Sequence, residues 1–312
     1  MRVLVTGASG FVGANLVVAL LSRGHAVVAL SLDALPAPFA VTEVRGDATD
    51  TGLVERVMRE QRIEAVWHGA AITAGPEREK REAARIVEVN LLATVRALEA
   101  AARAGVRRFI YPSSSAVYGE SALGEGGPLD EDAPLRPLNL YGITKVAAEA
   151  AVLRLAPALG VEACAGRINA VFGPWERDTG LRDTLSPHLQ MAAMAREGRE
   201  AILARGADRD WIYAPDVAQA FVRMLEAPSV PALAMNITQG ALWPLETMAR
   251  AFPGLKWRYG ETNLGYGGPI DRPRRCLSRR LAVENLQWTP AHSPEAACAA
   301  YAAWLATSPN RP

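Results

Sequence analysis

Cysteine and histidine are scarce in this 312-residue chain, and their scarcity argues against two kinds of site. The three cysteines, Cys164, Cys276 and Cys298, are odd in number, far apart and without the spacing of metal ligands. We therefore expect reduced thiols in a cytoplasmic protein. The four histidines offer little material for a histidine-based metal site, and we expect no bound metal.

A charge excess and long hydrophobic runs are also missing. The net charge is +1, which gives no support for a nucleic-acid or anionic-membrane partner. Two short basic clusters, 272–275 and 279–280, are interpreted as solvated surface or small-anion contacts. No apolar run reaches transmembrane length. A first strand that begins by Arg2 also leaves no room for a signal peptide, so we expect no membrane partner.

Hydrophobic residues make up 50% of the chain, and they fall in alternating strand-like and helix-like segments. Strands are predicted over residues 2–6, 26–30, 65–67, 108–111 and 161–167, and helices over 11–23, 79–104 and 141–159. This alternation predicts an α/β fold with a doubly wound parallel sheet of the Rossmann type.

Pro and Gly become frequent after residue 167, and the alternation weakens. Residues 1–168 plus about 211–230 are predicted to form a dinucleotide-binding domain. Residues about 169–210 and 231–312 are predicted to form a smaller, mainly C-terminal substrate-binding region. The Gly-, Pro- and acid-rich stretch 120–137 is expected to be a surface excursion beside the site.

A glycine-rich turn joins the first strand to the first helix. Gly7, Gly10 and Gly13 are spaced G-x-x-G-x-x-G, with Phe11 and Val12 opening the helix. Such glycines let a pyrophosphate approach the backbone at a helix N-terminus, which attracts anions. The alternative, a turn that only packs strand on helix, is disfavoured by this strand–turn–helix context.

The residues expected at the adenosine end favour NAD and leave NADP open. Asp33 lies 20 residues after Gly13, at the distance where an acid accepts the ribose 2′-OH. Ser31 ends the second strand, and no arginine follows closely to hold a 2′-phosphate. Asp47, after a third strand-like stretch, is a candidate for the adenine amine, although a simple turn aspartate is the alternative.

Tyr141 and Lys145 are spaced i, i+4 on one face of a predicted helix. A phenol with a pKa of about 10 is a poor base at neutral pH, and a nearby ammonium favours its phenolate. The pair can therefore exchange a proton with a substrate hydroxyl while hydride moves. Alone the spacing is weak, because exposed pairs share it. Ser113, Ser114 and Ser115 strengthen it, since they close a strand at the ligand-binding edge, where one hydroxyl would hold the substrate oxygen.

Together these segments resemble the extended short-chain dehydrogenase/reductase family, in the branch of nucleotide-sugar epimerases and dehydratases. The resemblance covers nearly the whole chain. It includes Gly7/Gly10/Gly13, His68-Gly-Ala-Ala71, Asn90, the run from Ser113 to Gly119, Tyr141/Lys145, Phe172-Gly-Pro174, the run from Arg209 to Tyr213, and the run from Leu286 to Pro290.

The resemblance implies specific roles. Ser114 matches the catalytic serine or threonine, and Lys145 would also hold the nicotinamide ribose. The cofactor site would further include Ser31, Asp33, Asp47, Ala48, Gly69, Ala70, Ala71, Asn90, Ser113 and Ile168. The substrate would meet Ser115, Asn169 and Arg209, of which Arg209 matches an arginine that grips a diphosphate; its alternative is an ion pair with Asp208 or Asp210.

One departure from the family pattern is Ser31, which replaces the usual acid at the end of the second strand. Two further features bear on the reaction. Dehydratases carry Asp-Glu after the catalytic serine, whereas Ser115 and Ala116 stand here, which argues against dehydration. Ala170 occupies the position of an asparagine that meets the substrate diphosphate, so one contact expected with a nucleotide sugar is missing.

The favoured function is an NAD-dependent epimerase acting at C4 of a nucleotide sugar. The alternative is a net dehydrogenase or reductase of a non-nucleotide sugar, sugar acid or hydroxy-carbonyl compound, which Ala170 favours. A non-catalytic dinucleotide-binding scaffold is disfavoured because Tyr141 and Lys145 are both present. The alanine-rich helix over 141–159 predicts a homodimer, with a buried face inside the monomer as the alternative.

Overall fold

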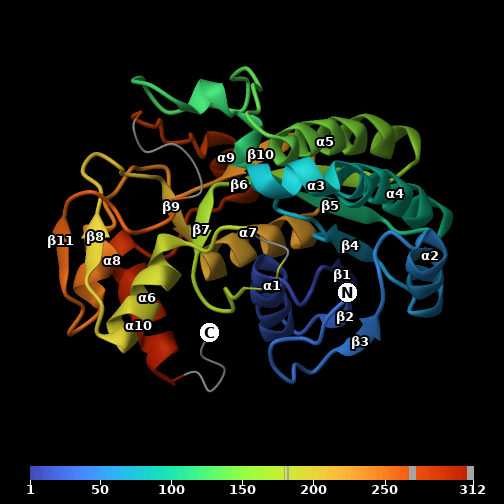
Figure 1. Ribbon diagram of the computed structural model, residues 1–312. Helices are drawn as coiled ribbons and strands as arrows, with labels where there is room; N and C mark the ends of the chain where they lie inside the picture. Colours follow the sequence, from blue (N-terminus) through green and yellow to red (C-terminus); the bar gives the residue numbers. More distant parts are fainter. Residues whose placement is uncertain (179, 181–182, 267–271, 308–312) are drawn as a thin grey trace.

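A seven-stranded parallel sheet forms the centre of the larger part of the molecule (Figure 1). The computed structural model describes residues 1–312 apart from 179, 181–182, 267–271 and 308–312. In spatial order the strands are β10 (Ala234–Ile237), β6 (Glu162–Ile168), β5 (Arg108–Ser114), β4 (Ala65–His68), β1 (Arg2–Thr6), β2 (Ala26–Ser31) and β3 (Thr42–Arg45). The predicted doubly wound fold is confirmed. The strand order reverses between β1 and β4, which is where ligands bind in such sheets.

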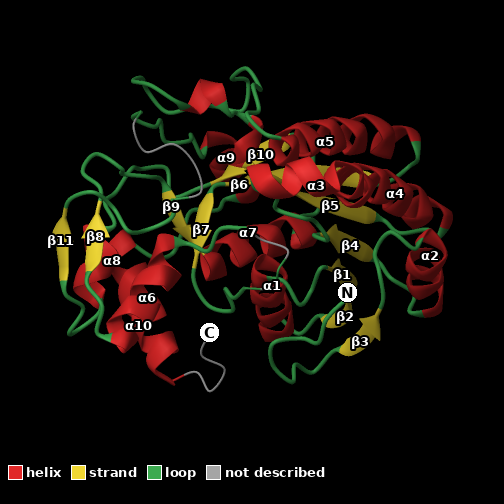
Figure 2. Ribbon diagram, in the orientation of Figure 1, coloured by secondary structure: helices red, strands yellow, loops and turns green. Residues whose placement is uncertain are grey.

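Helices cover both faces of this sheet (Figure 2). One face is covered by α1 (Phe11–Ser22) and α7 (Ala214–Glu226), which pack on each other. The other is covered by α2 (Thr51–Glu60), α4 (Ala93–Arg103) and α5 (Leu140–Ala158). Each layer buries its own apolar cluster against the sheet, as two-sided coverage of a parallel sheet requires.

The single helix predicted over 79–104 is divided in the structure. It consists of α3 (Pro76–Val87), a π-helical turn at Glu88–Leu92, and α4. The wider turn holds Asn90, which is 1% exposed and exchanges two hydrogen bonds with the backbone of Ile72. Single π turns are frequent at functional sites, and here the turn presents a polar side chain to the segment that follows β4.

The smaller part of the molecule is built from short elements around an aromatic cluster. Two strand pairs, β8 (Ala201–Leu203) with β11 (Trp257–Tyr259) and β7 (Ala170–Phe172) with β9 (Trp211–Tyr213), accompany α6 (Pro187–Glu197), α8 (Glu246–Ala251) and α10 (Pro294–Thr307). The cluster includes Phe172, Trp211, Trp243 and Tyr301. Chain from the 231–312 range also returns to the larger part, because β10 joins the main sheet and α9 (Arg280–Leu286) packs on α7 and β10.

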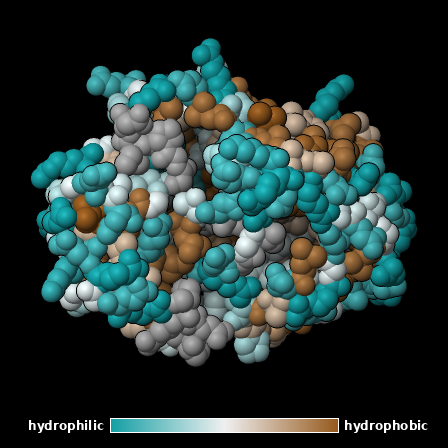
Figure 3. Space-filling view, viewed as in Figure 1, coloured by the Kyte–Doolittle hydropathy of each residue, from teal (hydrophilic) through white to brown (hydrophobic). Residues whose placement is uncertain are grey.

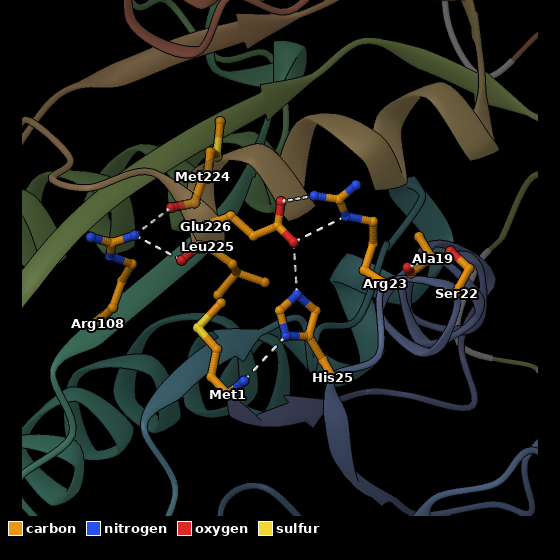
Figure 4. A network of polar contacts seen from close by, with 9 residues as sticks. All are labelled: Met1, Ala19, Ser22, Arg23, His25, Arg108, Met224, Leu225 and Glu226. Atoms are coloured by element: carbon orange, nitrogen blue, oxygen red, sulfur yellow. Dashed lines mark hydrogen bonds and ion pairs between the residues drawn. The ribbon is translucent and has the colours of Figure 1, made fainter.

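The C-terminus of α7 is fastened to the sheet by a polar network (Figure 4). Arg108 is fully buried on β5 and donates to the carbonyls of Met224 and Leu225 at 3.1 and 2.7 Å. Glu226 accepts from Arg23 and lies 2.9 Å from the His25 ring nitrogen Nε2. A cation satisfies the free carbonyls at a helix end, so this network fixes the crossover that carries the chain back from the smaller part.

Among the described helices, none is long and apolar enough to cross a membrane. The described residues also hold no group of three or more His, Cys, Asp or Glu side chains arranged to bind a metal ion.

Candidate active site

The glycine-rich turn lies at the carboxyl end of β1 and forms a tight backbone cradle. Gly7 has a φ of 68°, and a Cβ added there would lie 2.9 Å from the backbone nitrogen of Ala70. A Cβ on Gly13 would lie 2.3 Å from the Gly7 carbonyl oxygen. Only glycine fits these positions, so the backbone here is open to the close approach of a ligand.

Among the described residues, the N-terminus of α1 has no side chain that would neutralise its positive dipole end. The helix begins after Gly10, where no described side chain caps it, and its first turn contains no acidic residue. A helix N-terminus has unused N–H donors and a positive dipole end. The turn, with Phe11 and Val12 at the helix start, therefore fits the pyrophosphate of a dinucleotide.

Thr6 joins the turn to the segment after β4. Its Oγ1 accepts from the backbone N–H of Ala70 at 3.2 Å and lies 3.1 Å from Nδ1 of His68. This holds Gly69, Ala70 and Ala71 against the glycine turn, across the point where the strand order reverses. Thr6 was not among the predicted site residues, because a threonine at a strand end carries no distinctive sequence signal.

His68 is a neutral, structural histidine. Burial, and secondly the Lys145 cation, lower its pKa to about 3. His188, at the start of α6, is also fully buried, and burial lowers its pKa well below 6.5. His188 stacks on Phe172 with ring centroids 3.9 Å apart.

Acid is expected to destabilise the protein through these two histidines. Their folded pKa values are depressed, so below pH 6.5 the unfolded chain binds more protons and stability falls as the pH falls. Going from pH 7.5 to 5.5, each should remove on the order of 1 kcal/mol of unfolding free energy. In urea titrations at the two pH values, His188→Phe should remove about half of this combined loss. An unchanged loss in the variant would contradict the assignment.

Lys145 is held between β5 and α5, next to two tyrosines. Asn139 caps α5 by accepting from the N–H of Gly142 at 2.8 Å, which fixes the first turn. The Lys145 ammonium donates to the Pro112 carbonyl oxygen at 2.7 Å. It lies 5.8 Å from the ring centroid of Tyr141 and 4.7 Å from that of Tyr111. Tyr141 is half-buried, whereas Tyr111 is 1% exposed.

Tyr111 cannot serve as the base, although its ring is nearer to Lys145. Burial, followed by the neighbouring Tyr141 and Glu149, raises the Tyr111 pKa well above 10. Its hydroxyl is buried and has no hydrogen-bond partner among the described residues. Tyr111 therefore acts as a wall for the lysine, and Tyr141 remains as the group that a substrate can reach.

The serine run continues this arrangement along β5. The Oγ of Ser114 accepts from the N–H of Ala116 at 3.2 Å, so its own hydroxyl hydrogen can be donated to a substrate oxygen. Ser113 is 2% exposed, and its hydroxyl has no partner within the described chain. Ser115 is half-buried and starts a 3₁₀ turn, Ser115–Val117. In the sheet Ile168 pairs with Ser114, which places β6 beside the serines.

A buried ion pair lies one helical turn beyond Lys145. The carboxylate of Glu149 accepts from Arg167 on β6, with Nη2 at 2.6 Å and Nε at 3.1 and 3.2 Å. The two side chains are 4% and 6% exposed. Burial lowers the pKa of Lys145 to about 7, and the Glu149 carboxylate opposes this by raising it. Glu149 thus favours the charged lysine that supports a Tyr141 phenolate.

Replacing Glu149 by glutamine is therefore expected to change the pH profile. The Lys145 pKa should fall further, and the alkaline limb of the kcat profile should move down by about one pH unit. The Glu149→Gln, Arg167→Met double variant provides the control, because it does not leave a buried cation unpaired. Lower stability with an unmoved alkaline limb in both variants would show a purely structural role.

Asn90 links the cofactor side of the site to the helix of Tyr141. Besides its bonds to Ile72, its Nδ2 donates to Oγ1 of Thr144 at 3.2 Å, and that hydroxyl donates to the Tyr141 carbonyl at 2.8 Å. The side-chain amide of Asn90 is thus hydrogen-bonded to Ile72 and Thr144. Its position in the structure is therefore that of a residue that orients its neighbours.

At the adenosine end, the expected side chains lie around the ends of β2 and β3. Ser31 is buried and donates to the Asp33 carbonyl at 3.0 Å, while Asp33 is exposed. Asp47 pairs with Arg85 at 2.6 Å. Burial opposes ionisation of Asp47, but hydrogen bonds from Thr49 and Arg85 outweigh it and lower its pKa. Ala48, next to Asp47, is 8% exposed.

On the substrate side, two arginines converge. Arg209 is 6% exposed, and burial, followed by the Arg274 cation, lowers its pKa to about 9. Burial also lowers the pKa of Arg274. Arg209 lies 5.8 Å from the Tyr266 ring centroid, beside a hollow that Tyr266 helps to line. An arginine offers a planar fork of N–H donors that suits phosphate oxygens, so these two side chains fit an anionic group of a substrate.

Asp210 and Asn169 form hydrogen bonds with other residues. Asp210 accepts from the N–H groups of Leu277 and Gly240 at 3.0 and 3.1 Å. The described residues give no ion pair of Arg209 with Asp208 or Asp210, the alternative considered from the sequence. Asn169 donates to Thr238 at 3.3 Å. Half-buried Arg274 belongs to the 272–275 cluster, which was interpreted from the sequence as solvated surface or small-anion contacts, and it was not among the predicted substrate contacts.

Comparison with known proteins identifies the class of this site. The family model described as the NAD dependent epimerase/dehydratase family matches residues 3–237, and the chain belongs to this family. It is 31% identical to the UDP-glucose 4-epimerase of Azospirillum brasilense, over 93% of this chain and 88% of that one.

Solved structures give the same picture. MoeE5 in complex with UDP-glucose and NAD is 30% identical, with a TM-score of 0.79, covering 97% of this chain and 98% of that chain. The NAD complex of UDP-glucose 4-epimerase from Thermus thermophilus is 27% identical, with a TM-score of 0.82 and the same coverages. The predicted family and the epimerase class are thereby confirmed.

A different relative matches only part of the chain. A 3 beta-hydroxysteroid dehydrogenase/Delta 5-->4-isomerase of Mycobacterium tuberculosis is 39% identical over 181 residues, which is 55% of this chain and 47% of that one. This local similarity agrees with a shared dinucleotide-binding architecture.

Proposed function

We propose that the protein is an NAD-dependent 4-epimerase of a nucleotide sugar. The observation that carries the proposal is the position of the Lys145 ammonium, 5.8 Å from the Tyr141 ring, where α5 packs on β5, the strand that ends in Ser114. The similarity to UDP-glucose 4-epimerases along nearly the whole chain supports it. NAD would occupy the glycine turn and supply a reversible hydride acceptor.

Ser114, Tyr141 and Lys145 would each have a separate role in moving the proton of the substrate hydroxyl. Ser114 donates its hydroxyl hydrogen to the substrate oxygen and holds it near Tyr141. The Tyr141 phenolate takes the hydroxyl proton and returns it after the sugar has turned. Lys145 keeps the phenolate charge favourable, and the Pro112 carbonyl holds the ammonium in place. Ser115 and Ala116 provide no second acid–base pair, so elimination of water is not supported.

Arg209 and Arg274 would hold the substrate diphosphate. Their desolvated guanidinium groups suit paired phosphate oxygens, because an arginine offers a planar fork of donors. Buried Arg209 and half-buried Arg274 would compensate for Ala170, which lacks the amide expected at its position. Asn169 and Ser115 remain proposed substrate contacts beside this anion site.

A substrate panel tests this function. Purified protein with its retained dinucleotide would be incubated with UDP- and dTDP-hexoses, and the products separated by chromatography. Interconversion of C4 epimers without net growth of NADH absorbance is the expected result. The proposal would be overturned if no nucleotide sugar in the panel were turned over and none stabilised the protein against heat.

The second candidate is a net dehydrogenase of a smaller hydroxy compound. Ala170 favours it, because it removes a contact specific to nucleotide diphosphates, and the partial similarity to a hydroxysteroid dehydrogenase agrees with it. Its signature would be NADH absorbance that grows with substrate across aldoses, uronates and hydroxy acids. Growing NADH absorbance with these compounds, together with no turnover of nucleotide sugars, would favour the dehydrogenase over the epimerase.

We further propose that two copies pair through α5. Its outward residues include Ile143 and Leu155, exposed by 50% and 36%, and Figure 3 shows apolar surface where Figure 1 places this helix. Interspersed alanines would allow a second α5 to approach closely. Light scattering should give a dimer mass that Leu155→Glu lowers to the monomer mass, whereas Val283→Glu on α9 leaves it unchanged. A monomer mass for the unmodified protein would reject the pairing.

The free cysteines support a reducing, cytoplasmic location as part of this proposal. All three are free thiols, and Cys164 and Cys298 are buried. Detection of the protein in a periplasmic or secreted fraction would contradict that location.

A further inference from the structure

An arginine from the smaller part of the molecule reaches the adenosine end of the cofactor site. Arg177 follows β7 in sequence, and its Nη2 donates to the carbonyl of Ser9 at 3.2 Å and to that of Ala34 at 3.5 Å. Ser9 lies inside the glycine turn, and Ala34 is three residues beyond the end of β2. The guanidinium therefore spans the two segments between which the adenosine ribose of a dinucleotide lies.

This position is fixed by packing of the residues that come just before Arg177 in the chain. Asn15 of α1 donates to the Pro174 carbonyl at 2.8 Å. The ring of Trp175 meets that of Phe39 edge-on, with centroids 5.5 Å apart. Phe39 belongs to the loop after β2, so the 174–177 segment is anchored to the helix that opens the phosphate site and to the loop that borders the ribose.

The charge balance around Arg177 favours an anion. Within the described residues, both hydrogen bonds of its guanidinium are to carbonyl oxygens, and neither partner is a carboxylate. A guanidinium has five N–H donors in a planar fork, so most of its donors remain for a ligand. The uncapped N-terminus of α1, next to Ser9, adds a positive dipole end.

The last residue of β2 is uncharged, and the nearest acid, Asp33, lies two residues beyond it. Sites selective for NAD place an acid there, which accepts the ribose 2′-OH and repels a phosphate. Here Ser31 is 4% exposed and spends its hydroxyl on the Asp33 carbonyl at 3.0 Å. The Asp33 side chain is exposed, and no hydrogen bond directs it toward Arg177.

We propose that Arg177 binds a phosphate on the adenosine ribose, so that the protein accepts NADP as well as NAD. The inference rests on the proposed dinucleotide site and adds a residue that sets its cofactor range. It also places part of the cofactor site in the smaller region, since Arg177 reaches the glycine turn from there. The 2′-phosphate would replace carbonyl contacts of Arg177 by charge-assisted hydrogen bonds, which are stronger.

Calorimetric binding tests the proposal without reliance on turnover. The ligands are NAD, NADP, 5′-ADP and 2′,5′-ADP, titrated into protein freed of copurified dinucleotide. NADP should bind within about threefold of NAD or more tightly. Arg177→Gln should weaken NADP and 2′,5′-ADP by at least about tenfold, as expected for one charge-assisted contact, and NAD by less than about threefold.

Arg45→Gln is the matched control. Arg45 also reaches the end of β2, donating to the Leu32 carbonyl at 3.2 Å, but it is already paired with Glu43 at 2.7 Å. Its replacement should leave all four affinities within about threefold. Binding of NAD without NADP, or an equal loss of both in Arg177→Gln, would overturn this inference alone. Absence of binding by any of the dinucleotides would overturn the proposed function as well.

Discussion

Replacement of Tyr141 by phenylalanine is expected to reduce kcat by about 10³-fold, within the range for loss of one positioned acid–base group. The ring and its packing on α5 stay, but no phenolate can form. The Lys145 ammonium keeps its bond to the Pro112 carbonyl, because that contact does not involve the tyrosine. Stability and dinucleotide retention should therefore change little.

Tyr111→Phe is the control that makes this result specific. Tyr111 also faces Lys145, and its ring is the nearer of the two. Its hydroxyl is buried without a described partner, so its removal should leave kcat within about threefold and the fold intact. If Tyr111→Phe abolished activity and Tyr141→Phe did not, the assignment of the base would be wrong. Activity would be measured as interconversion of the sugar epimers, with bound NAD quantified in each variant.

Local signals in the sequence predicted most of the sheet. The strand predicted over 2–6 is β1 itself, and the glycines at 7, 10 and 13 occupy the turn that follows it. The helix predicted over 141–159 is α5, shifted by one residue at each end. Short apolar strands, glycine turns and i, i+4 pairs depend on neighbouring residues only, so they can be read without the fold.

The unpredicted features depend on contacts between distant parts of the chain. Arg177 is 168 residues from Ser9, to which it donates, and the sequence near β2 gave no sign of an arginine. Glu149 is buried as an ion pair with Arg167, which lies on another element. Thr6 bonds to a segment 64 residues away. Such pairings depend on the order of the strands in the sheet. The sequence predicts the class of fold but not this order.

The split of the helix over 79–104 has the same origin. The local sequence opposes a continuous helix there only weakly: the segment has no internal glycine or proline, although Ile86, Val87 and Val89 lie at or just before the split and are weaker helix formers. The π turn is stabilised by Asn90, whose partners Ile72 and Thr144 lie on other segments. Tertiary hydrogen bonds thus override local propensity at a position that orients the helix of Tyr141.

Replacement of Lys145 by methionine should reduce kcat by about 10²- to 10³-fold. Methionine keeps the apolar stem in its packed position between Tyr111 and Tyr141 but removes the charge. Without the cation, the phenolate of Tyr141 is no longer favoured, and alkaline pH should restore part of the activity, because hydroxide then supplies the deprotonated tyrosine. A rising alkaline limb in Lys145→Met, absent in the unmodified protein, is the signature of an electrostatic role.

The stability of this variant separates charge from packing. Lys145 is 4% exposed and burial lowers its pKa, so the loss of hydration destabilises the ammonium in the folded protein. Methionine removes that desolvation cost, and urea denaturation should show no loss of stability beyond about 1 kcal/mol. Lys80→Met, at an exposed position on α3, serves as the charge-loss control and should retain full activity. Unfolding of Lys145→Met, or activity loss that alkaline pH does not relieve, would show that the lysine acts mainly through the Pro112 contact rather than through its charge on Tyr141.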